Sequence, residues 1–200
     1  MTGRPGRTGR DALLALGLFA VTFTWMLATA RDVGVARDEG IYINGAEAYV
    51  RYVEEVKKRP GLRKDKDTIA RHYRVNSEHP PLTKHLYGLS WRLLHWCTCH
   101  QAQPTVRPVK APHQTLGWLS DLTAFRLPAF VMTGVLVAFI YLLGAEIFGR
   151  SAGLLAALSY VVIPRVFFHS HLAGLDAPIT TAMVVTVYAY YRALESWRWS

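Results

Sequence analysis

The stretch ALLALGLFAVTFTWMLATA at residues 12–30 and the stretch LPAFVMTGVLVAFIYLLGA at residues 127–145 contain no charged side chain. At a rise of ~1.5 Å per residue, a helix of this length crosses a hydrocarbon layer of ~30 Å. Two further apolar blocks follow, and the first of them contains one arginine, Arg165. We therefore predict an all-α polytopic membrane protein with about four transmembrane helices, at residues 12–30, 127–147, 151–173 and 177–194.

The basic residues at the start of the chain indicate its orientation in the membrane. Three arginines precede the first apolar stretch and are opposed only by Asp11. Because short basic segments stay in the cytoplasm, we predict a cytoplasmic N-terminus at residues 1–11 and a long external loop at residues 31–126. A cleaved signal peptide is the alternative for residues 12–30, but its apolar part usually has ~7–15 residues, so an uncleaved anchor is favoured.

The composition restricts the partners of the chain. It has 200 residues, 51% hydrophobic side chains and a net charge of +9. The basic residues are spread over loops and do not form one face, so we expect membrane lipid and no nucleic acid as a partner. Cys97 and Cys99 are separated by one residue, which is awkward for a disulfide bond and too sparse for a closed zinc site.

Two amphipathic juxtamembrane helices are expected in the external loop. At about residues 39–59, apolar side chains recur at helical spacing and charged ones occupy the other faces. A second helix should begin at Pro81 and continue to about residue 97, with leucines along one side. The charge-dense stretch at residues 62–76 between them is typical of a mobile loop.

Asp38 and Glu39 follow the first apolar stretch and allow two interpretations. In the structural one, Asp38 is a helix N-cap whose carboxylate accepts backbone N–H bonds. In the functional one, Asp38 is a general base that takes a proton from an attacking hydroxyl group. Glu39 would then orient Asp38, or it would simply favour the positive end of the helix dipole.

Asp176 presents the same two interpretations, because Asp176-Ala177-Pro178 also looks like a capped helix start. The four-span orientation places Asp176 at the same outer surface as Asp38. Ionisable groups at membrane depth are usually functional. We expect the two carboxylates to face one cavity, where they could share a divalent cation that neutralises a leaving phosphate.

Arg165 lies inside the third predicted span, with His169 four residues later on the same helix face and His171 just beyond. Its guanidinium group either snorkels to the interface or binds phosphate oxygens as a bidentate fork. The histidines are candidate ligands, or they form ordinary hydrogen bonds. Arg126, at the outer end of the second span, is predicted to be an interface anchor.

The string EHPPLTK at residues 78–84 is the most distinctive motif of the loop. Its two prolines fix the chain before a helix, so His79 and Lys84 are presented rigidly near a helix N-terminus, a position that favours anions. Taken alone, the string is also compatible with a rigid turn.

The motifs occur in a fixed order. They are Asp38-Glu39, His79-Pro80-Pro81-Leu82 with Lys84, Arg126-Leu127-Pro128, Tyr141-Leu142-Leu143-Gly144, Ile147-Phe148-Gly149-Arg150, Ala152-Gly153-Leu154-Leu155-Ala156-Ala157 and Leu175-Asp176-Ala177-Pro178. In this order they resemble the membrane glycosyltransferases of the GT-C class, in particular the bacterial proteins similar to protein O-mannosyltransferases and the aminoarabinose transferase of lipid A.

The resemblance implies an inverting enzyme of the bacterial inner (plasma) membrane with an external active site. Such an enzyme takes a sugar from a polyprenyl-phosphate carrier and gives it to a protein, lipid or glycan acceptor. It also implies that the acidic residue of the first external loop, Asp38, is the general base, that Asp176 matches a second acidic position, and that the His-Pro-Pro-Leu segment lines the donor phosphate site. The predicted catalytic residues are Asp38 and Asp176, and the predicted substrate-binding residues are Glu39, Glu78, His79, Lys84 and Arg165.

One departure from the family pattern keeps other functions open. Members usually have many more spans than the four expected here, so the chain is either the N-terminal portion of such an enzyme or a reduced relative. The alternative is a non-enzymatic membrane subunit or an inactive fragment, in which the acidic residues only cap helices. A transporter is the third candidate function. It ranks below the other two because paired repeats and broken helices at mid-membrane depth are not visible in the sequence.

Overall fold

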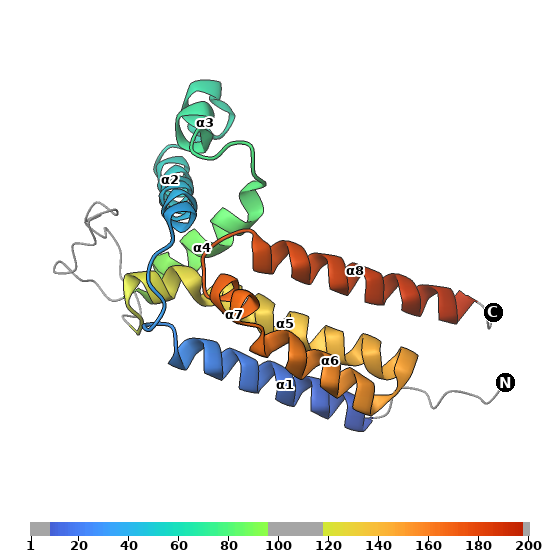
Figure 1. Cartoon of the computed structure of the whole chain (residues 1–200). Coiled ribbons are helices and arrows are strands. Elements are labelled where there is room, and N and C mark those ends of the chain that lie inside the picture. Colours follow the sequence, from blue (N-terminus) through green and yellow to red (C-terminus); the bar gives the residue numbers. More distant parts are fainter. Residues whose placement is uncertain (1–8, 96–117, 198–200) are drawn as a thin grey trace. The chain divides into compact units, whose positions relative to one another are not determined.

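The computed structural model describes residues 9–95 and 118–197 (Figure 1). Within these ranges the regular elements are helices and no β-strand is present, which confirms the all-α prediction for this part of the chain. Cys97, Cys99, residues 1–8 and the end of the helix predicted at 81–97 lie outside the described residues. The helices are α1 (Gly9–Ala28), α2 (Arg37–Lys58), the 3-10 helix η1 (Pro60–Lys64), α3 (Lys66–Tyr73), α4 (Pro81–Leu94), α5 (Asp121–Phe148), α6 (Arg150–Val162), α7 (Pro164–Ser170) and α8 (Asp176–Trp197).

The chain divides into two compact units. Unit 1 consists of Met1–Ala30, Ala129–His171 and Leu175–Ser200. Unit 2 consists of Arg31–Pro128 and Leu172–Gly174. Helix α5 therefore begins in unit 2 and continues in unit 1, and each unit is described by itself below.

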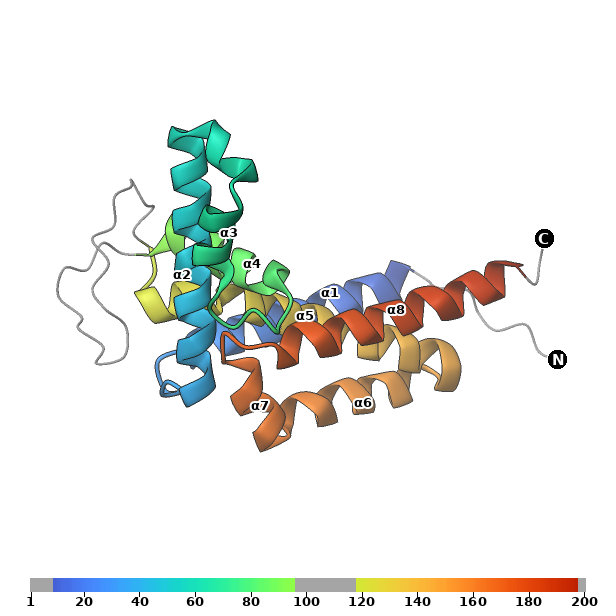
Figure 2. The same cartoon turned by 90° about the horizontal axis from the view of Figure 1, so that it is seen from above.

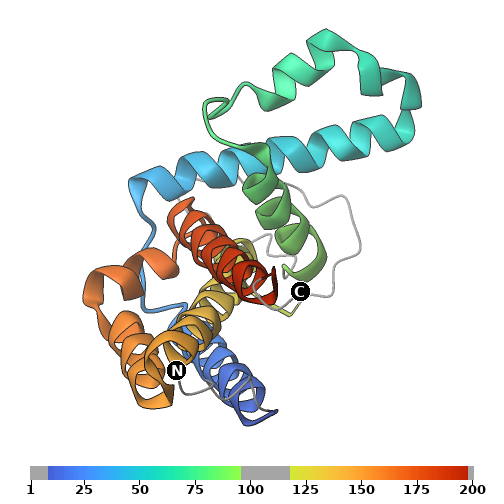
Figure 3. The same cartoon turned by 90° about the vertical axis from the view of Figure 1, so that its right-hand side faces the viewer.

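Unit 1 contains the helices that are candidates for crossing a membrane. Helices α1 and α5 are long and apolar enough, and α6 with α7 would make a third span if the bent pair counts as one. Within unit 1, α1, α5, α6 and α8 run alongside one another (Figures 2 and 3). The predicted membrane protein is supported, whereas the count of four spans is not confirmed, because α8 is not among the candidates.

Glycines bring α5 and α6 into close contact inside unit 1. A Cβ atom added at Gly153 would lie 2.6 Å from the carbonyl oxygen of Tyr141, and one added at Gly144 would lie 2.8 Å from the Cα of Gly153. The connection between the two helices is Gly149, whose φ of 95° is readily adopted only by glycine. The small residues in the predicted motif therefore allow two backbones to touch.

An ion pair joins the ends of α1 and α6 in unit 1. Arg150 donates from Nε to Oδ1 of Asp11 at 2.6 Å, and the hydroxyl of Tyr141 in α5 donates to the same oxygen at 3.1 Å. Asp11 is 9% exposed, so three helices meet at one largely buried carboxylate. This contact fixes which helices neighbour one another in unit 1.

The third predicted span is broken, which corrects the single helix expected at residues 151–173. Helix α6 ends at Val162, α7 begins at Pro164, and the two helices are bent by 71°. The physical reason is Pro164, which has no N–H to donate and whose ring excludes the residue before it from helical geometry. Ile163 accordingly has extended backbone, with φ −65° and ψ 120°.

Unit 2 is built on the crossing of α2 and α4. A Cβ atom added at Gly88 in α4 would lie 2.6 Å from the carbonyl oxygen of Ala46 in α2, so the two backbones are in contact. Trp91 of α4 then stacks on Phe125 at the start of α5, with ring centroids 5.1 Å apart. Helices α2 and α4 occupy the stretches where loop helices were expected, and their location at a membrane surface stays a prediction.

The stretch at residues 62–76 is structured, which corrects the mobile loop expected there. It contains the end of η1 and the whole of α3. Asp65 is the N-cap of α3, and its carboxylate accepts a hydrogen bond from the backbone N–H of Thr68 at 2.9 Å. At the other end of α3, Tyr73 stacks on Tyr49 of α2 with centroids 4.2 Å apart. One cap and one aromatic contact thus order a charge-rich segment.

Candidate functional site

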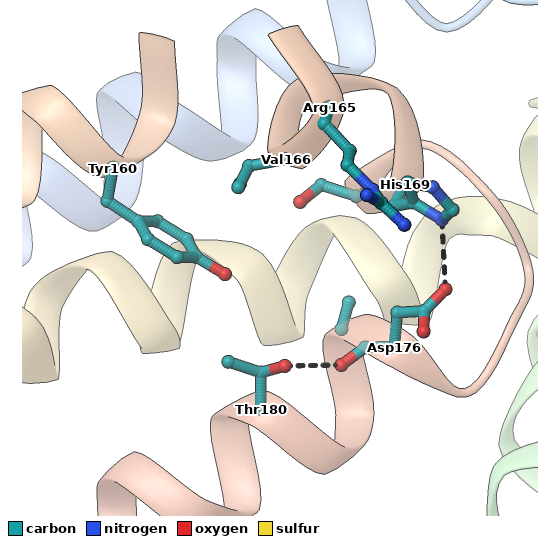
Figure 4. A pocket seen from close by; sticks show the side chains of 8 residues that line it. Tyr160, Arg165, Val166, His169, Asp176 and Thr180 are labelled. Atoms are coloured by element: carbon teal, nitrogen blue, oxygen red, sulfur yellow. Dashed lines mark hydrogen bonds and ion pairs between the residues drawn. The ribbon is translucent and has the colours of Figure 1, made fainter. Parts of the chain in front are cut away.

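One pocket in unit 1 gathers predicted functional residues from both sides of the break at Pro164. It has a volume of about 220 Å³ and lies between the end of α6, helix α7 and the start of α8 (Figure 4). Arg165, His169 and Asp176 lie together in it. The full lining is Tyr160, Arg165, Val166, His169, Ser170, Asp176, Ala177 and Thr180. We call it the Arg165 pocket.

His169 and Asp176 form a hydrogen-bonded pair in the Arg165 pocket. The distance between His169 Nδ1 and Asp176 Oδ2 is 3.0 Å, and the side chains are 39% and 70% exposed. An ionised carboxylate can only accept, so Nδ1 must carry the hydrogen. The other ring nitrogen, Nε2, is then left for a ligand, as acceptor when the ring is neutral or as donor when it is protonated.

The bend of the chain presents Arg165 to the same pocket. Arg165 is the second residue of α7 and is exposed, and within the described residues it forms no ion pair. In Figure 4 its guanidinium group lies beside the ring of His169. Tyr160 and Thr180 line the pocket farther from this charged end. A guanidinium, an imidazole and a carboxylate with one open side could hold an oxyanion such as phosphate.

His171 holds α7 in place and does not face the Arg165 pocket. It is fully buried, and its Nε2 lies 2.8 Å from the hydroxyl of Thr29. Its Nδ1 lies 2.7 Å from the carbonyl oxygen of Phe167, whose ring in turn contacts Trp25 of α1 at 5.0 Å. These contacts agree with the second alternative for His171, in which the side chain forms ordinary hydrogen bonds and is not a ligand.

Asp38 in unit 2 does not cap α2. The N-cap is Ala36, without a side-chain hydrogen bond, and Asp38 is the second helical residue. Its side chain is exposed, and within the described residues it makes no hydrogen bond or ion pair. The capping interpretation is therefore not the one observed, and the carboxylate is accessible to a substrate. Asp176 belongs to unit 1, so the expectation that both carboxylates face one cavity stays a prediction.

Glu39 and Arg126 form a buried ion pair that sequence reasoning did not find. Arg126 donates to both carboxylate oxygens of Glu39 at 2.7 Å, and both side chains are 0% exposed. The same guanidinium donates to the carbonyl oxygens of Val33 and Gly34 at 2.8 and 2.7 Å. The backbone N–H of Ala173 donates to Glu39 Oε1 at 2.8 Å. We call these residues the Arg126 cluster.

The Arg126 cluster changes the interpretation of two residues. Arg126 is not an interface anchor, because its guanidinium group is enclosed by unit 2 and saturated with acceptors. Glu39, predicted to bind substrate, has both oxygens occupied by Arg126, which favours a structural role. The two residues are 87 positions apart, and no local pattern in the sequence links them.

Lys84 is also buried, although it was predicted to bind a donor phosphate. The residue is 0% exposed, and its ammonium group donates to the carbonyl oxygens of Asn76 and His79, the latter at 3.3 Å. It also donates to the hydroxyl of Tyr49 at 3.4 Å. Burial lowers the pKa of Lys84, and the Glu78 carboxylate partly opposes that shift. In this structure Lys84 fixes the turn before α4.

The turn fixed by Lys84 displays two other predicted residues. The ring of His79 stacks on Tyr42, with centroids 5.8 Å apart, and Glu78 is exposed. Asn76, at the start of the turn, has a positive φ of 55°. Roles of Glu78, His79 and Lys84 in substrate binding stay predictions. Within residues 9–95 and 118–197, no three His, Cys, Asp or Glu side chains are grouped as metal ligands would be, and the divalent cation also stays a prediction.

Comparison with known proteins finds a similarity in the second part of the chain. Residues 119–200 match the family model described as dolichyl-phosphate-mannose-protein mannosyltransferase. This match confirms the resemblance to GT-C membrane glycosyltransferases and points to glycosyltransferase activity in general. The matched range includes the whole Arg165 pocket, whereas Asp38 lies before it. No curated protein and no solved structure matches the chain.

Proposed function

We propose that the protein transfers a sugar from a polyprenyl-phosphate-linked donor to an acceptor hydroxyl on the extracytoplasmic side of a bacterial inner membrane, with inversion at the sugar carbon. The observation that carries the proposal is the meeting of Arg165, His169 and Asp176 in one pocket inside the range matched by the family. A glycosyltransferase that uses a lipid-phosphate donor needs an anion site next to apolar helices, and the Arg165 pocket fits that need.

In the proposed mechanism, the Arg165 pocket holds the phosphate of the donor. Arg165 would bind phosphate oxygens through its fork of N–H groups, and His169 would donate from Nε2 while Asp176 keeps the ring oriented through Nδ1. As the bond between the sugar carbon and the phosphate oxygen breaks, negative charge accumulates on the leaving phosphate. Fixed positive groups at that place stabilise the transition state more than the ground state.

Asp38 is proposed to complete the reaction as the general base. The acceptor oxygen attacks the sugar carbon on the face opposite the phosphate and loses its proton to the Asp38 carboxylate. The products are the glycosylated acceptor and the polyprenyl phosphate, and the proton on Asp38 is later released to water. The carboxylate at the start of α2 is exposed and has no partner among the described residues, which supports this assignment.

The test is transfer of radiolabelled mannose from polyprenyl-phosphate mannose by the full chain in liposomes, with membrane lipids and envelope proteins of the expression host as acceptors. Asp38→Asn should lower the rate at least ~100-fold, because general bases contribute ~10²–10⁴. Asp32→Asn, at an exposed aspartate in the segment before α2, is the matched control and should leave the rate unchanged. Transfer at the normal rate by Asp38→Asn would refute the role of Asp38.

The donor pocket is tested separately by Arg165→Gln, with Arg10→Gln at another exposed arginine of unit 1 as control. Loss of one phosphate contact should raise the donor KM about tenfold. The alternative of a non-enzymatic membrane subunit predicts no transfer by the wild-type chain with any acceptor, and a stability change of ~1 kcal/mol at most in Asp38→Asn. The two functions therefore differ in the wild-type measurement itself.

A further inference from the structure

A second cavity, in unit 2, lies against the helix that carries Asp38. Its volume is about 560 Å³, which is within the ~300–1,000 Å³ range of small-molecule sites. Ten residues from the segment before α2, from α2 and from α5 line it: Arg31, Val33, Gly34, Val35, Ala36, Arg37, Gly40, Ile41, Asn44 and Leu122. We call it the Arg37 cavity.

One face of α2 forms a wall of the Arg37 cavity. Arg37, Gly40, Ile41 and Asn44 are spaced at i, i+3, i+4 and i+7 and therefore share a face. The other side of α2 is buried in unit 2 through residues such as Tyr42, Ile43 and Ala46. Asp38 follows Arg37 directly in α2 and is exposed, although it does not itself line the cavity.

A second wall of the cavity is a backbone segment that the Arg126 cluster holds in place. Val33 and Gly34 both line the cavity, and the carbonyl oxygen of each accepts a hydrogen bond from the buried guanidinium of Arg126. Because Arg126 also pairs with Glu39 in α2, the same cluster fixes both walls relative to each other within unit 2. The cavity is therefore a built feature and not a gap in a flexible loop.

The lining of the Arg37 cavity has a definite chemistry. It contains two guanidinium groups, from Arg31 and Arg37, and no carboxylate. Both arginines are exposed, and within the described residues neither forms an ion pair. The remainder is the amide of Asn44 and apolar side chains such as Ile41 and Leu122. Positive charge beside apolar surface suits a ligand that is anionic at one point and apolar elsewhere.

The position of Arg31 in the chain favours a lipid as the source of that ligand. Arg31 follows the last residue of the candidate membrane helix α1, Ala28, by three residues. At ~3.6 Å per residue at most, Arg31 stays within ~11 Å of the end of that helix, so a membrane-spanning α1 would bring it to the headgroup region. Arginine at that depth interacts readily with phosphate groups of lipids.

We propose that the Arg37 cavity binds the acceptor of sugar transfer, and that this acceptor is a lipid with an anionic headgroup. The anionic group lies between the guanidinium groups of Arg31 and Arg37, and a hydroxyl of the same headgroup reaches Asp38. The inference rests on the proposed function and narrows its acceptor from protein, lipid or glycan to one class of lipid.

Binding is measured first, by native mass spectrometry of the full chain with phosphatidylglycerol and with phosphatidylcholine of the same acyl chains. The wild-type chain should prefer phosphatidylglycerol about tenfold or more, because two charge-assisted contacts are involved. The double variant Arg31→Gln/Arg37→Gln should lose that preference. The matched control Lys57→Gln/Lys58→Gln removes the same charge from exposed positions of α2 outside the cavity and should keep it.

A cavity-filling variant tests the site without removing charge. A Cβ atom added at Gly40 meets nothing within 4 Å, so Gly40→Leu should fold and fill the cavity. It should weaken phosphatidylglycerol binding about tenfold while circular dichroism stays unchanged. Equal binding of both lipids by the wild-type chain, or a preference that survives both variants, would overturn the inference. Displacement of phosphatidylglycerol by glycerol phosphate at equal concentration would contradict the claim that the ligand is a lipid.

The transfer assay separates this inference from the proposed function. With phosphatidylglycerol liposomes as the acceptor, Asp38→Asn should lose transfer but keep the lipid preference, whereas Gly40→Leu should raise the acceptor KM with little change in donor KM. Transfer of the label to protein alone, with no labelled lipid, would contradict the inference but not the proposed function. Lipid preference without any transfer by the wild-type chain would count against the function itself.

Discussion

The Arg165 pocket in unit 1 and the Arg126 cluster in unit 2 hold their charged side chains in opposite ways. His169 and Asp176 are 39% and 70% exposed and share one hydrogen bond, whereas Arg126 and Glu39 are completely buried and share two. An exposed pair contributes little to folding and can exchange its partner for a ligand. A buried pair cannot be loosened without leaving a charge unpaired. The difference separates groups suited to chemistry from groups that fix the backbone.

The largest effect is expected from breaking the buried pair. Arg126→Met should destabilise the protein by ~3–5 kcal/mol, because the Glu39 carboxylate would stay buried without its partner. Arg92→Met is the comparison, since among the described residues Arg92 forms one ion pair, with Glu54 at 2.9 Å, and is partly exposed. Thermal unfolding in detergent, followed by circular dichroism, measures both. A loss in Arg126→Met no larger than in Arg92→Met would contradict the structural role of the Arg126 cluster.

The next largest effect concerns pH and Glu47 of α2. Burial raises the pKa of Glu47 to about 7 from 4.5, with Arg51 opposing the shift and the Asp121 carboxylate adding to it. Between these two values the folded state binds more protons than the unfolded state. The contribution of Glu47 to the free energy of unfolding should therefore be greatest below pH 4.5. It should fall by at most ~3 kcal/mol as the pH rises to 7.

The pH prediction is checked with Glu47→Gln, which cannot titrate. Its unfolding midpoint, measured from pH 4.5 to 8, should change less with pH than that of the wild-type protein. Glu54→Gln serves as a control on the same helix. The same slope in wild type and Glu47→Gln would show that this group is not the cause.

A smaller effect is expected where helices touch through glycine. Gly153→Ala in unit 1 and Gly88→Ala in unit 2 each place a Cβ atom 2.6 Å from a backbone carbonyl oxygen, and each should cost ~1–3 kcal/mol. Gly17→Ala meets nothing within 4 Å and should stabilise α1 by a few tenths to ~1 kcal/mol, since alanine favours helix. Unfolding midpoints of the three variants give the ranking, and a neutral Gly153→Ala would mean that α5 and α6 are not in contact.

The smallest effect on stability is expected for the exposed pair of the Arg165 pocket. Asp176→Asn should change the free energy of unfolding by less than ~1 kcal/mol, because exposed pairs rarely contribute more. In the transfer assay, by contrast, the change should be large, since Asp176 orients His169. A large loss of stability with unchanged transfer would show that the exposed pair, like the Arg126 cluster, has a structural role and not a chemical one.

Local sequence signals predicted much of the fold and part of the candidate site. Uncharged stretches gave α1 and α5, and helical spacing indicated helices in the loop, because both signals are carried by neighbouring residues. Arg165, His169 and Asp176 were recognised as candidates from their residue types in an apolar context. The break between α6 and α7 also has a local signal, Pro164, but the apolar block that surrounds it is long enough to predict a single span.

Local patterns in the sequence did not predict contacts between residues that are far apart in the chain. The cap at Asp65 and the stacking of Tyr73 on Tyr49 turned a predicted loop into α3, and the second of these needs α2 as its partner. The burial of Lys84 likewise depends on α2, because Gly45 leaves room for its side chain. A charged residue in a sequence looks the same whether it binds a substrate or a backbone carbonyl.

The sequence by itself determined that the chain is helical and apolar enough for a membrane, and which residue types are available for sugar transfer, since hydrophobicity and helical period are local properties. Only the tertiary structure decided that Glu39 and Arg126 neutralise each other inside unit 2 while Asp38 stays exposed, and that a bend brings Arg165 and His169 to Asp176. The reason is physical: burial and pairing are set by which distant segments fold against each other, and they decide whether a charge stabilises the protein or remains available to a ligand.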